Sequence, residues 1–317
     1  MERILALRRV SLLAGLPAEE VSIIAEHARE RLFAKGTALL REGEPISAIH
    51  VILDGRAHLS RRGQVMGHVT AGGVVGGMGM LGRDVEGLAA VAETDTQTLE
   101  LEVDAVLEIF EDHFPILHHA LRENCRDVLD LMGRLPPHLY QQAMPPFADA
   151  KGPAADLDLV DRILFLRQIA PFARSSINAL AELSRGLAEV SFPPGTTVWK
   201  EGEASGSVLL VVSGTVTGVA RGGAARFSAG PGAPLGSVES MAEQPRWFTL
   251  VTDAKVSGLH GSLEGFIDVF EDNFEMAMDY LALIARWQLR ILEMRVSAVG
   301  QSVERFYGCD EASDDPN

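Results

Sequence analysis

An internal duplication constrains the fold of this 317-residue chain more than any other feature. The segment FAKGTALLREGE begins at Phe33 and FPPGTTVWKEGE begins at Phe192, an offset of 159 residues (192 − 33). Farther along, VLEIFEDHF ends at Phe114 and FIDVFEDNF ends at Phe274, an offset of 160 residues (274 − 114). Because a repeat of this length is a structural unit of its own, the sequence predicts two domains built alike.

Each copy predicts the same order of elements. Apolar residues at helical spacing come first, over residues 16–30 and 175–187, with Ser175 or Ser176 as the N-cap of the second helix. Short Val-, Leu- and Ile-rich runs follow, interrupted by glycine turns, which is typical of a β-barrel or jelly roll. We therefore predict a mainly β fold with flanking helices: two tandem jelly-roll barrels, each closed by a long C-terminal helix.

The composition of the chain indicates where each domain begins and ends. We predict domain 1 over residues 1–133, a linker over 134–158, domain 2 over 159–299 and an acidic tail over 300–317. The linker is rich in proline and alanine, which favours a flexible connection. The tail, ending in DEASDDPN, is acidic and is expected to be disordered.

Each closing helix carries a seam with steps of four and three residues, the spacing of helices that pack along each other. This pairing can form within the chain or between two chains of a homodimer. Asn124 interrupts the first seam and is expected to fix its register. The two seams are Phe110, Phe114, Leu117, Leu121, Asn124, Val128 and Leu131, and Phe270, Phe274, Ala277, Leu281, Ile284, Gln288 and Ile291.

Charge, cysteine content and hydropathy exclude several classes of protein. The net charge of −16 opposes a phosphate backbone, so we expect no nucleic-acid partner. The two cysteines, Cys125 and Cys309, are too few for a disulfide framework or a four-cysteine cluster. The richest apolar run, residues 208–212, is far shorter than the roughly 18 residues of a membrane helix. No signal peptide is visible, and we expect a cytoplasmic protein without membrane contact.

Catalytic and metal-binding patterns are also missing from the sequence. His118 and His119 are adjacent and would diverge by about 100° on a helix. There is no paired-ligand motif, no phosphate-loop lysine and no nucleophile beside a base. We predict a protein that is not an enzyme and has no metal or cofactor, although haem ligation by a single histidine stays open. Few residues follow the second long helix, so no helix-turn-helix is expected.

The repeated motif resembles the cyclic nucleotide-binding domain, a family that includes the catabolite activator protein and the regulatory subunits of cyclic-AMP-dependent kinase. The resemblance implies a jelly roll that takes cAMP or cGMP and a protein partner that reads the bound state. The residues that carry it are Gly36, Glu42, Gly43 and Gly55 in the first copy and Gly195, Glu201, Gly202 and Gly214 in the second.

In that family, a phosphate cassette F-G-E-[LIV]-A followed by P-R-[AS]-A holds the ligand. The resemblance places Gly76 on the cassette glycine, Gly77 on the glutamate and Glu86 on the arginine. A carboxylate at the phosphate position reverses the sign of an interaction of about 4 kcal/mol at 4 Å. Arg83 is the nearest basic residue in the loop. We expect the first cassette to be degenerate and without ligand.

The second cassette keeps more of the pattern. The resemblance places Gly236 on the glycine and Arg246 on the phosphate-binding arginine, while Ser237 replaces the glutamate and offers a hydroxyl to the ribose. Trp247 and Phe248 stand where the family keeps small residues.

Two functions remain open. In the first, the chain is a sensor in which domain 2 binds cAMP or cGMP with Arg246 on the phosphate. Glu239 is near this cassette but is expected on another side of a short helix than Ser237. In the second, both pockets have decayed, and the chain is a ligand-free scaffold for protein–protein interaction. An open second pocket favours the sensor, and a pocket filled by Trp247 and Phe248 favours the scaffold.

Overall fold

The computed structural model describes residues 2–8, 10, 13–83, 87–145, 150 and 157–299. The chain forms two compact units, residues 1–120 with 292–317 and residues 121–291. Glu86 and the acidic tail lie outside the described residues. None of the described helices is long and apolar enough to cross a membrane.

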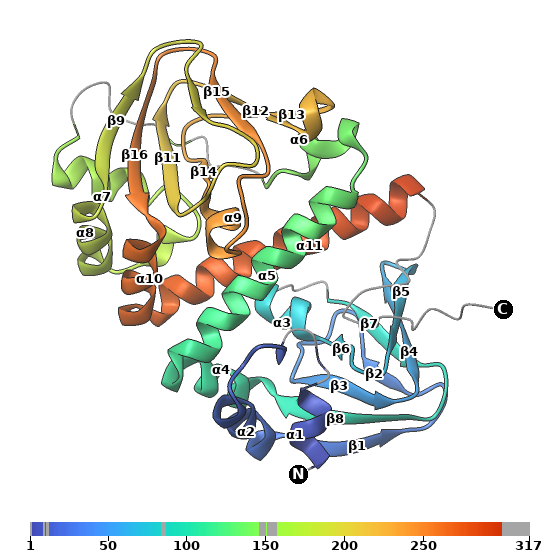
Figure 1. Cartoon of the computed structure of the whole chain (residues 1–317). Helices are drawn as coiled ribbons and strands as arrows, with labels where there is room; N and C mark the ends of the chain where they lie inside the picture. Colours follow the sequence, from blue (N-terminus) through green and yellow to red (C-terminus); the bar gives the residue numbers. More distant parts are fainter. Residues whose placement is uncertain are drawn as a thin grey trace. The chain divides into compact units, whose positions relative to one another are not determined.

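The first unit contains a β-roll preceded by two short helices and followed by two more (Figure 1). In chain order its elements are α1 (Glu2–Leu7), α2 (Ala18–His27), β1 (Arg29–Phe33), β2 (Ala38–Leu40), β3 (Ala48–Asp54), β4 (Arg56–Arg61), β5 (Gln64–Thr70), β6 (Val74–Val75), α3 (Gly77–Gly82), β7 (Ala89–Ala92), β8 (Thr96–Glu102), α4 (Val103–Asp112) and α5 (Phe114–Arg134), which continues into the second unit.

The second unit repeats this order after a few short helices. Its elements are η2 (Pro137–Leu139), α6 (Tyr140–Ala143), α7 (Leu159–Leu166), η3 (Phe172–Arg174), α8 (Ile177–Arg185), β9 (Ala188–Phe192), β10 (Thr197–Trp199), β11 (Ser207–Ser213), β12 (Val216–Ala220), η4 (Arg221–Gly223), β13 (Ala225–Ala229), β14 (Pro234–Leu235), α9 (Ser237–Met241), β15 (Thr249–Thr252), β16 (Val256–Ser262), α10 (Leu263–Asp272) and α11 (Phe274–Val299).

Strand order confirms the duplication and the jelly roll. Each roll has two four-stranded antiparallel sheets, ordered β1-β8-β3-β6 and β2-β7-β4-β5 in the first copy. The second copy has β9-β16-β11-β14 and β10-β15-β12-β13, which is the same order strand for strand. Apolar side chains alternate along the strands, as in β12, where Val216, Gly218 and Ala220 are buried. This alternation places the core inside each roll.

The repeated glycines and glutamates hold the turns of the scaffold. Gly55 and Gly214 have φ angles of 91° and 87°, and a Cβ at either would meet a backbone carbonyl oxygen at 2.5 and 2.4 Å. Only glycine fits such a turn. The first glutamate of each EGE motif accepts a backbone N–H from the hairpin turn, Glu42 from Arg62 and Glu201 from Arg221. These residues therefore support the fold itself.

Each roll is closed by a long helix, α5 or α11, as predicted, but the seams traced from Phe110 and Phe270 cross a break. His113 and Asn273 have non-helical dihedrals, with φ −131° and −136°, so Phe110 and Phe270 lie in the last turn of α4 and α10, while Phe114 and Phe274 begin α5 and α11. In the second copy the Asn273 side chain donates to the Val269 carbonyl at 2.8 Å, a bond to the last turn of α10. An apolar seam cannot reveal such a break, because the spacing continues across it.

Helix pairing is confirmed within the second unit, where the C-terminal part of α5 packs on α11 (Figure 1). The Gln288 amide donates to the Asn124 carbonyl at 2.9 Å, and both residues are buried. Cys125 Sγ lies 3.9 Å from the Tyr280 hydroxyl. The pairing therefore forms within the chain, and the backbone of Asn124, with the side chain of Gln288, makes the polar link.

The first part of the predicted linker is helical. Residues 137–143 form η2 and α6, and the Gln141 amide makes two hydrogen bonds with the backbone of Ser228 in β13, at 2.6 and 3.5 Å. Residues 146–149 and 151–156 lie outside the described part. Proline and alanine content predicted flexibility here, but a proline also starts helical turns, as Pro137 does.

Candidate functional site

A glycine begins the cassette helix in both rolls. Gly76 and Gly236 have φ angles of 93° and 85° and are the N-caps of α3 and α9. Without a Cβ each glycine can adopt this left-handed conformation, which turns the chain from a strand into the helix. The predicted glycine positions are therefore the structural starting points of both cassettes.

The first cassette carries no polar side chain at its helix start. Gly77 and Gly79 lie in α3, and a Cβ on Gly79 would meet Ile46 Cδ1 at 2.5 Å. Arg83 follows the helix with φ 51°, and its side chain is exposed. The predicted effect of Glu86 falls outside the described residues. Close packing of α3 on its neighbour takes the place of ligand-binding groups.

Arg246 points into the second roll, where both Nη atoms are hydrogen-bonded to the protein, while the buried Nε has no hydrogen-bond partner among the described residues. It is 4% exposed, and Nη1 donates to the Gly236 carbonyl and to Glu239 Oε1, both at 3.2 Å. Nη2 donates to the backbone and hydroxyl oxygens of Ser207, at 3.0 and 2.9 Å. The guanidinium also lies 4.3 Å from the centre of the Trp199 ring. The group that would bind a phosphate is bound to the protein's own acceptors.

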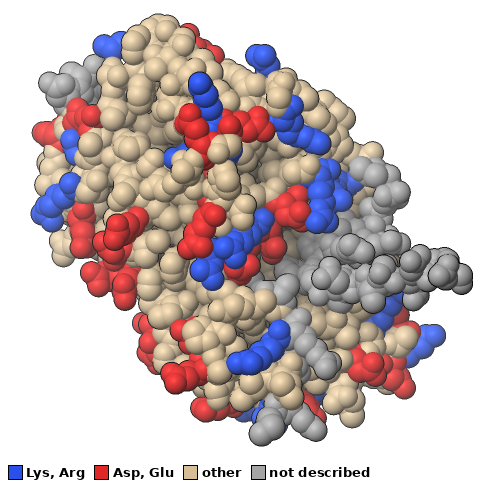
Figure 2. All heavy atoms as spheres, viewed as in Figure 1, with Lys and Arg blue, Asp and Glu red and all other residues tan. Residues whose placement is uncertain are grey.

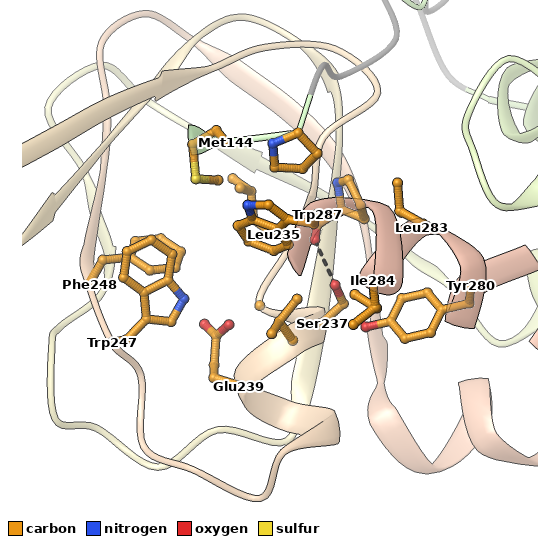
Figure 3. Close-up of a pocket in the computed structure, with 14 residues that line it drawn as sticks. Met144, Leu235, Ser237, Glu239, Trp247, Phe248, Tyr280, Leu283, Ile284 and Trp287 are labelled. Atoms are coloured by element: carbon orange, nitrogen blue, oxygen red, sulfur yellow. Dashed lines mark hydrogen bonds between the residues drawn. The ribbon is translucent and has the colours of Figure 1, made fainter. Parts of the chain in front are cut away.

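Glu239 supplies the negative charge at this site. Its side chain is 1% exposed, and it comes from α9, the cassette helix itself. Burial raises the pKa of the Glu239 carboxyl, while a backbone hydrogen bond and the charge of Arg246 act in the opposite direction. In Figure 3 Glu239 and Ser237 project from different sides of α9, and Arg246 contacts Glu239 on its own side of the helix.

Aromatic side chains fill the rest of the second pocket (Figure 3). Trp247 stacks on Phe227 with ring centres 5.3 Å apart and meets Phe248 edge to face at 4.6 Å. In Figure 3 the indole of Trp247 points toward the Glu239 carboxylate, and a hydrogen bond from Trp247 is among the influences on that carboxyl's pKa. The remaining cavity is about 30 Å³, and since a water needs about 10–15 Å³, it admits a few waters at most.

Ser237 lies at the predicted place but bonds inward to the protein. Its hydroxyl donates to the Pro234 carbonyl at 3.0 Å (Figure 3), and the side chain is 8% exposed. Ser237 is also hydrogen-bonded to the Tyr280 hydroxyl, whose pKa is raised well above its usual value, mainly by burial. The hydroxyl that was predicted for a ribose thus serves the contact between α9 and α11.

A segment after α5 lines the pocket, a contact that no sequence pattern predicted. Met144 and Pro145 line the cavity together with Trp287 of α11 (Figure 3). The Trp287 indole donates to the Ala143 carbonyl at 2.7 Å, and the Tyr140 hydroxyl donates to the Met132 carbonyl at 2.8 Å. These two hydrogen bonds hold residues 140–145 against the pocket.

The helix α5 also holds the cassette helix of the second roll. Arg126 Nε donates to the Ala242 carbonyl at 3.0 Å, at the C-terminus of α9, and Nη2 donates to Glu243 at 3.4 Å. A cation at a helix C-terminus is favourable because the last carbonyls are unpaired. Arg126 therefore fixes α9 from outside the roll.

Among the described residues, no group of three His, Cys, Asp or Glu side chains is placed to hold a metal ion. On the face in Figure 2, acidic and basic side chains are interspersed. Neither observation identifies a ligand, so the cassette residues stay the candidate site.

Comparison with known proteins identifies the class. Residues 30–113 match the family model of the cyclic nucleotide-binding domain. The match lies in the first roll, and the second roll repeats the strand order of the first. No curated protein matches the chain.

Several solved structures are similar to the chain at low identity. The regulatory domain of Toxoplasma gondii PKA with cAMP is 14% identical, with 86% of this chain and 93% of that chain covered and a TM-score of 0.35. The regulatory subunit of a cAMP-independent protein kinase A from Trypanosoma cruzi, bound to guanosine, is 14% identical over 84% and 85%, with a TM-score of 0.36. The N-terminal domain of a Streptomyces coelicolor transcriptional regulator is 22% identical over 39% and 91%, with a TM-score of 0.35.

Proposed function

We propose that this chain is a non-enzymatic regulatory protein whose second pocket is closed by its own side chains and which works without nucleotide. Its role is to present two cyclic nucleotide-binding domains to a protein partner. The observation that carries the proposal is the ion pair between Arg246 and Glu239, with 3.2 Å between Nη1 and Oε1. A carboxylate from α9 supplies the anion that a cyclic phosphate would supply.

Three features support an internally occupied pocket. The guanidinium of Arg246 has hydrogen bonds to three residues of the roll. Displacing Glu239 would leave a carboxylate buried without its cation, which is costly. A nucleotide would also have to move Trp247 and Phe248 out of an aromatic cluster, because the present cavity, of about 30 Å³, is far too small for it.

One observation favours a second candidate, the nucleotide sensor. Arg246 follows a turn proline, points inward and touches the carbonyl of the cassette glycine Gly236. In this alternative, cAMP or cGMP replaces Glu239 on Arg246 while Trp247 moves aside.

Isothermal titration with cAMP and cGMP distinguishes the two. The proposal predicts no saturable heat up to millimolar nucleotide with the full chain. Saturable binding that is lost in Arg246→Lys would contradict it and support the sensor. Nucleotide that co-purifies with the protein, detected by mass spectrometry, would contradict it as well.

A second experiment opens the pocket. The double variant Glu239→Gln, Trp247→Ala removes the competing carboxylate and the largest ring beside it, so we expect measurable affinity for cyclic nucleotide to appear. The matched control Glu243→Gln, Phe165→Leu changes an exposed acid and a buried ring outside this pocket. Equal behaviour of the two folded double variants would show that Glu239 and Trp247 do not close the site.

A further inference from the structure

Domain 1 contains an apolar cavity on the inner side of its cassette helix. Its volume is about 70 Å³, and its walls come from the segment before α2 and from α2, β3, β8, α3, α4 and α5. Met80 and Leu81 of α3, Phe110 of α4 and Ile116 of α5 are among the lining residues. All of the lining belongs to one compact unit.

Water is a poor occupant of this space. A buried water needs about 10–15 Å³ and two to four polar partners. The volume would take several waters, but among the lining side chains only His119 is polar. An apolar cavity of this kind stays dry or takes an apolar molecule, and an engineered cavity of about 150 Å³ in another protein binds benzene. The smaller space here fits a correspondingly smaller molecule.

Gly77 contributes to the open space. It lies inside α3, and its φ is not among the positive ones, so the backbone there does not require glycine. The nearest atom to a Cβ built on Gly77 is Val74 Cγ1 at 3.5 Å, an ordinary contact. The corresponding residue of the second roll is Ser237, whose side chain is used in a hydrogen bond. Domain 1 therefore has glycine where domain 2 has a hydrogen-bonded serine, and the space beside this glycine is part of the cavity.

We propose that domain 1 binds a small uncharged apolar molecule in this cavity, smaller than benzene and of the size of a short aliphatic chain. Its contacts with α3 on one side and with α4 and α5 on the other would hold the cassette helix against the helices that close the domain. A ligand that binds only the folded domain also stabilises it by mass action. This inference concerns domain 1 and stands apart from the closed pocket of domain 2.

The test uses the full chain with labelled Ile, Leu, Val and Met methyl groups. Xenon and propane are titrated separately and followed by NMR, with ethanol as a polar analogue of propane. We expect saturable shifts at Met80, Leu81 and Ile116, a raised Tm and a weaker response to ethanol. Absence of saturable shifts with both xenon and propane would overturn the proposal, and so would equal binding of ethanol.

Two cavity variants keep the test independent of the probes. Ala120→Leu fills the cavity from α5 and should reduce the xenon response severalfold. Gly77→Ala should raise the Tm by more than Gly133→Ala, because Gly133 is in α5 with nothing near its Cβ and gains only helix propensity. Should Ala120→Leu fail to fold, the difference in Tm between Gly77→Ala and Gly133→Ala still tests whether Gly77 borders an open cavity. An undiminished xenon response in folded Ala120→Leu, or equal gains from both alanines, would overturn the assignment.

Discussion

Arg246 and Glu239 depend on each other in the interior of the second roll. Each is almost fully buried, and each is the charged partner of the other. A buried ion pair contributes little when complete, but removal of one partner leaves an uncompensated charge. The corresponding residues of the first copy are Gly79 and Glu86, so neither member of the pair is present there. Alignment of the two copies shows that Glu239 and Arg246 occur together in the second copy and are both absent from the first, which is the sequence signal that pairs them.

Replacement of Arg246 by alanine should therefore destabilise domain 2 by about 3–5 kcal/mol, because Glu239 stays buried without its cation. Urea unfolding followed by tryptophan fluorescence measures the loss, since Trp199 and Trp247 lie beside the pair. The double variant Glu239→Gln, Arg246→Met should lose much less. Equal losses in the single and double variants would contradict this interpretation.

Asp127 gives a pH dependence whose sign can be worked out. Burial, together with the nearby Glu123 and Asp130, raises the pKa of the Asp127 carboxyl from 3.8 to about 7. The folded state thus holds this proton more tightly than the unfolded state, so the stabilisation is complete below pH 4 and is lost as the pH rises through 7. Asp127→Asn should remove this slope and increase stability at pH 8 by on the order of 2 kcal/mol. Unfolding curves from pH 5 to 8 test it, and an unchanged slope in the variant would disprove it.

At the scale of elements, α5 belongs to both compact units, with residues 114–120 in the first and residues 121–134 in the second. The break at His113 separates it from α4, and its C-terminal part contacts both α11 and α9. The seam pattern predicted the pairing with α11, because apolar spacing records which face is buried. It did not predict the contact with α9, because a single arginine on the exposed side of a helix has no periodic signal.

Arg126→Ala should release the C-terminus of α9. The side chain donates to the Ala242 carbonyl, and loss of a hydrogen bond from a charged donor costs about 1.5–3 kcal/mol at most and less where water replaces it. We expect hydrogen exchange of the α9 amides to accelerate about tenfold. The control is Arg134→Ala in the same helix, which breaks only an exposed pair with Asp130. Matching exchange rates in the two variants would rule out the clamp.

At the scale of the whole molecule, the duplication and the turn residues made the fold predictable. Glycines with positive φ and strand-length apolar runs are local signals, so both rolls follow from them. The state of the second pocket was not predictable in the same way. Whether Trp247 fills the pocket or faces solvent depends on packing with Phe227 and Tyr140, which come from distant parts of the chain.

The thiol of Cys125 should report on unfolding of the second unit. It is fully buried between α5 and α11, and burial raises the pKa of the thiol above its usual range. Because the thiolate is the reactive form, alkylation of Cys125 in the native protein should be negligible and should rise with urea in step with tryptophan fluorescence. A Cys309→Ser background removes the second thiol from the assay. Rapid alkylation without urea would show that α5 and α11 separate readily.

At one cross-strand pair the two rolls place the large residue on opposite strands. In the first copy Leu59 faces Gly67, and in the second Gly218 faces Phe227, whose ring lies where a Cβ on Gly218 would be. Recombination between the two halves of the gene with a crossover inside this hairpin would join Leu59 to Phe227 or Gly67 to Gly218. The first product would be overfilled at this pair and the second would leave a hole, so the two hairpins cannot be exchanged in part without loss of packing.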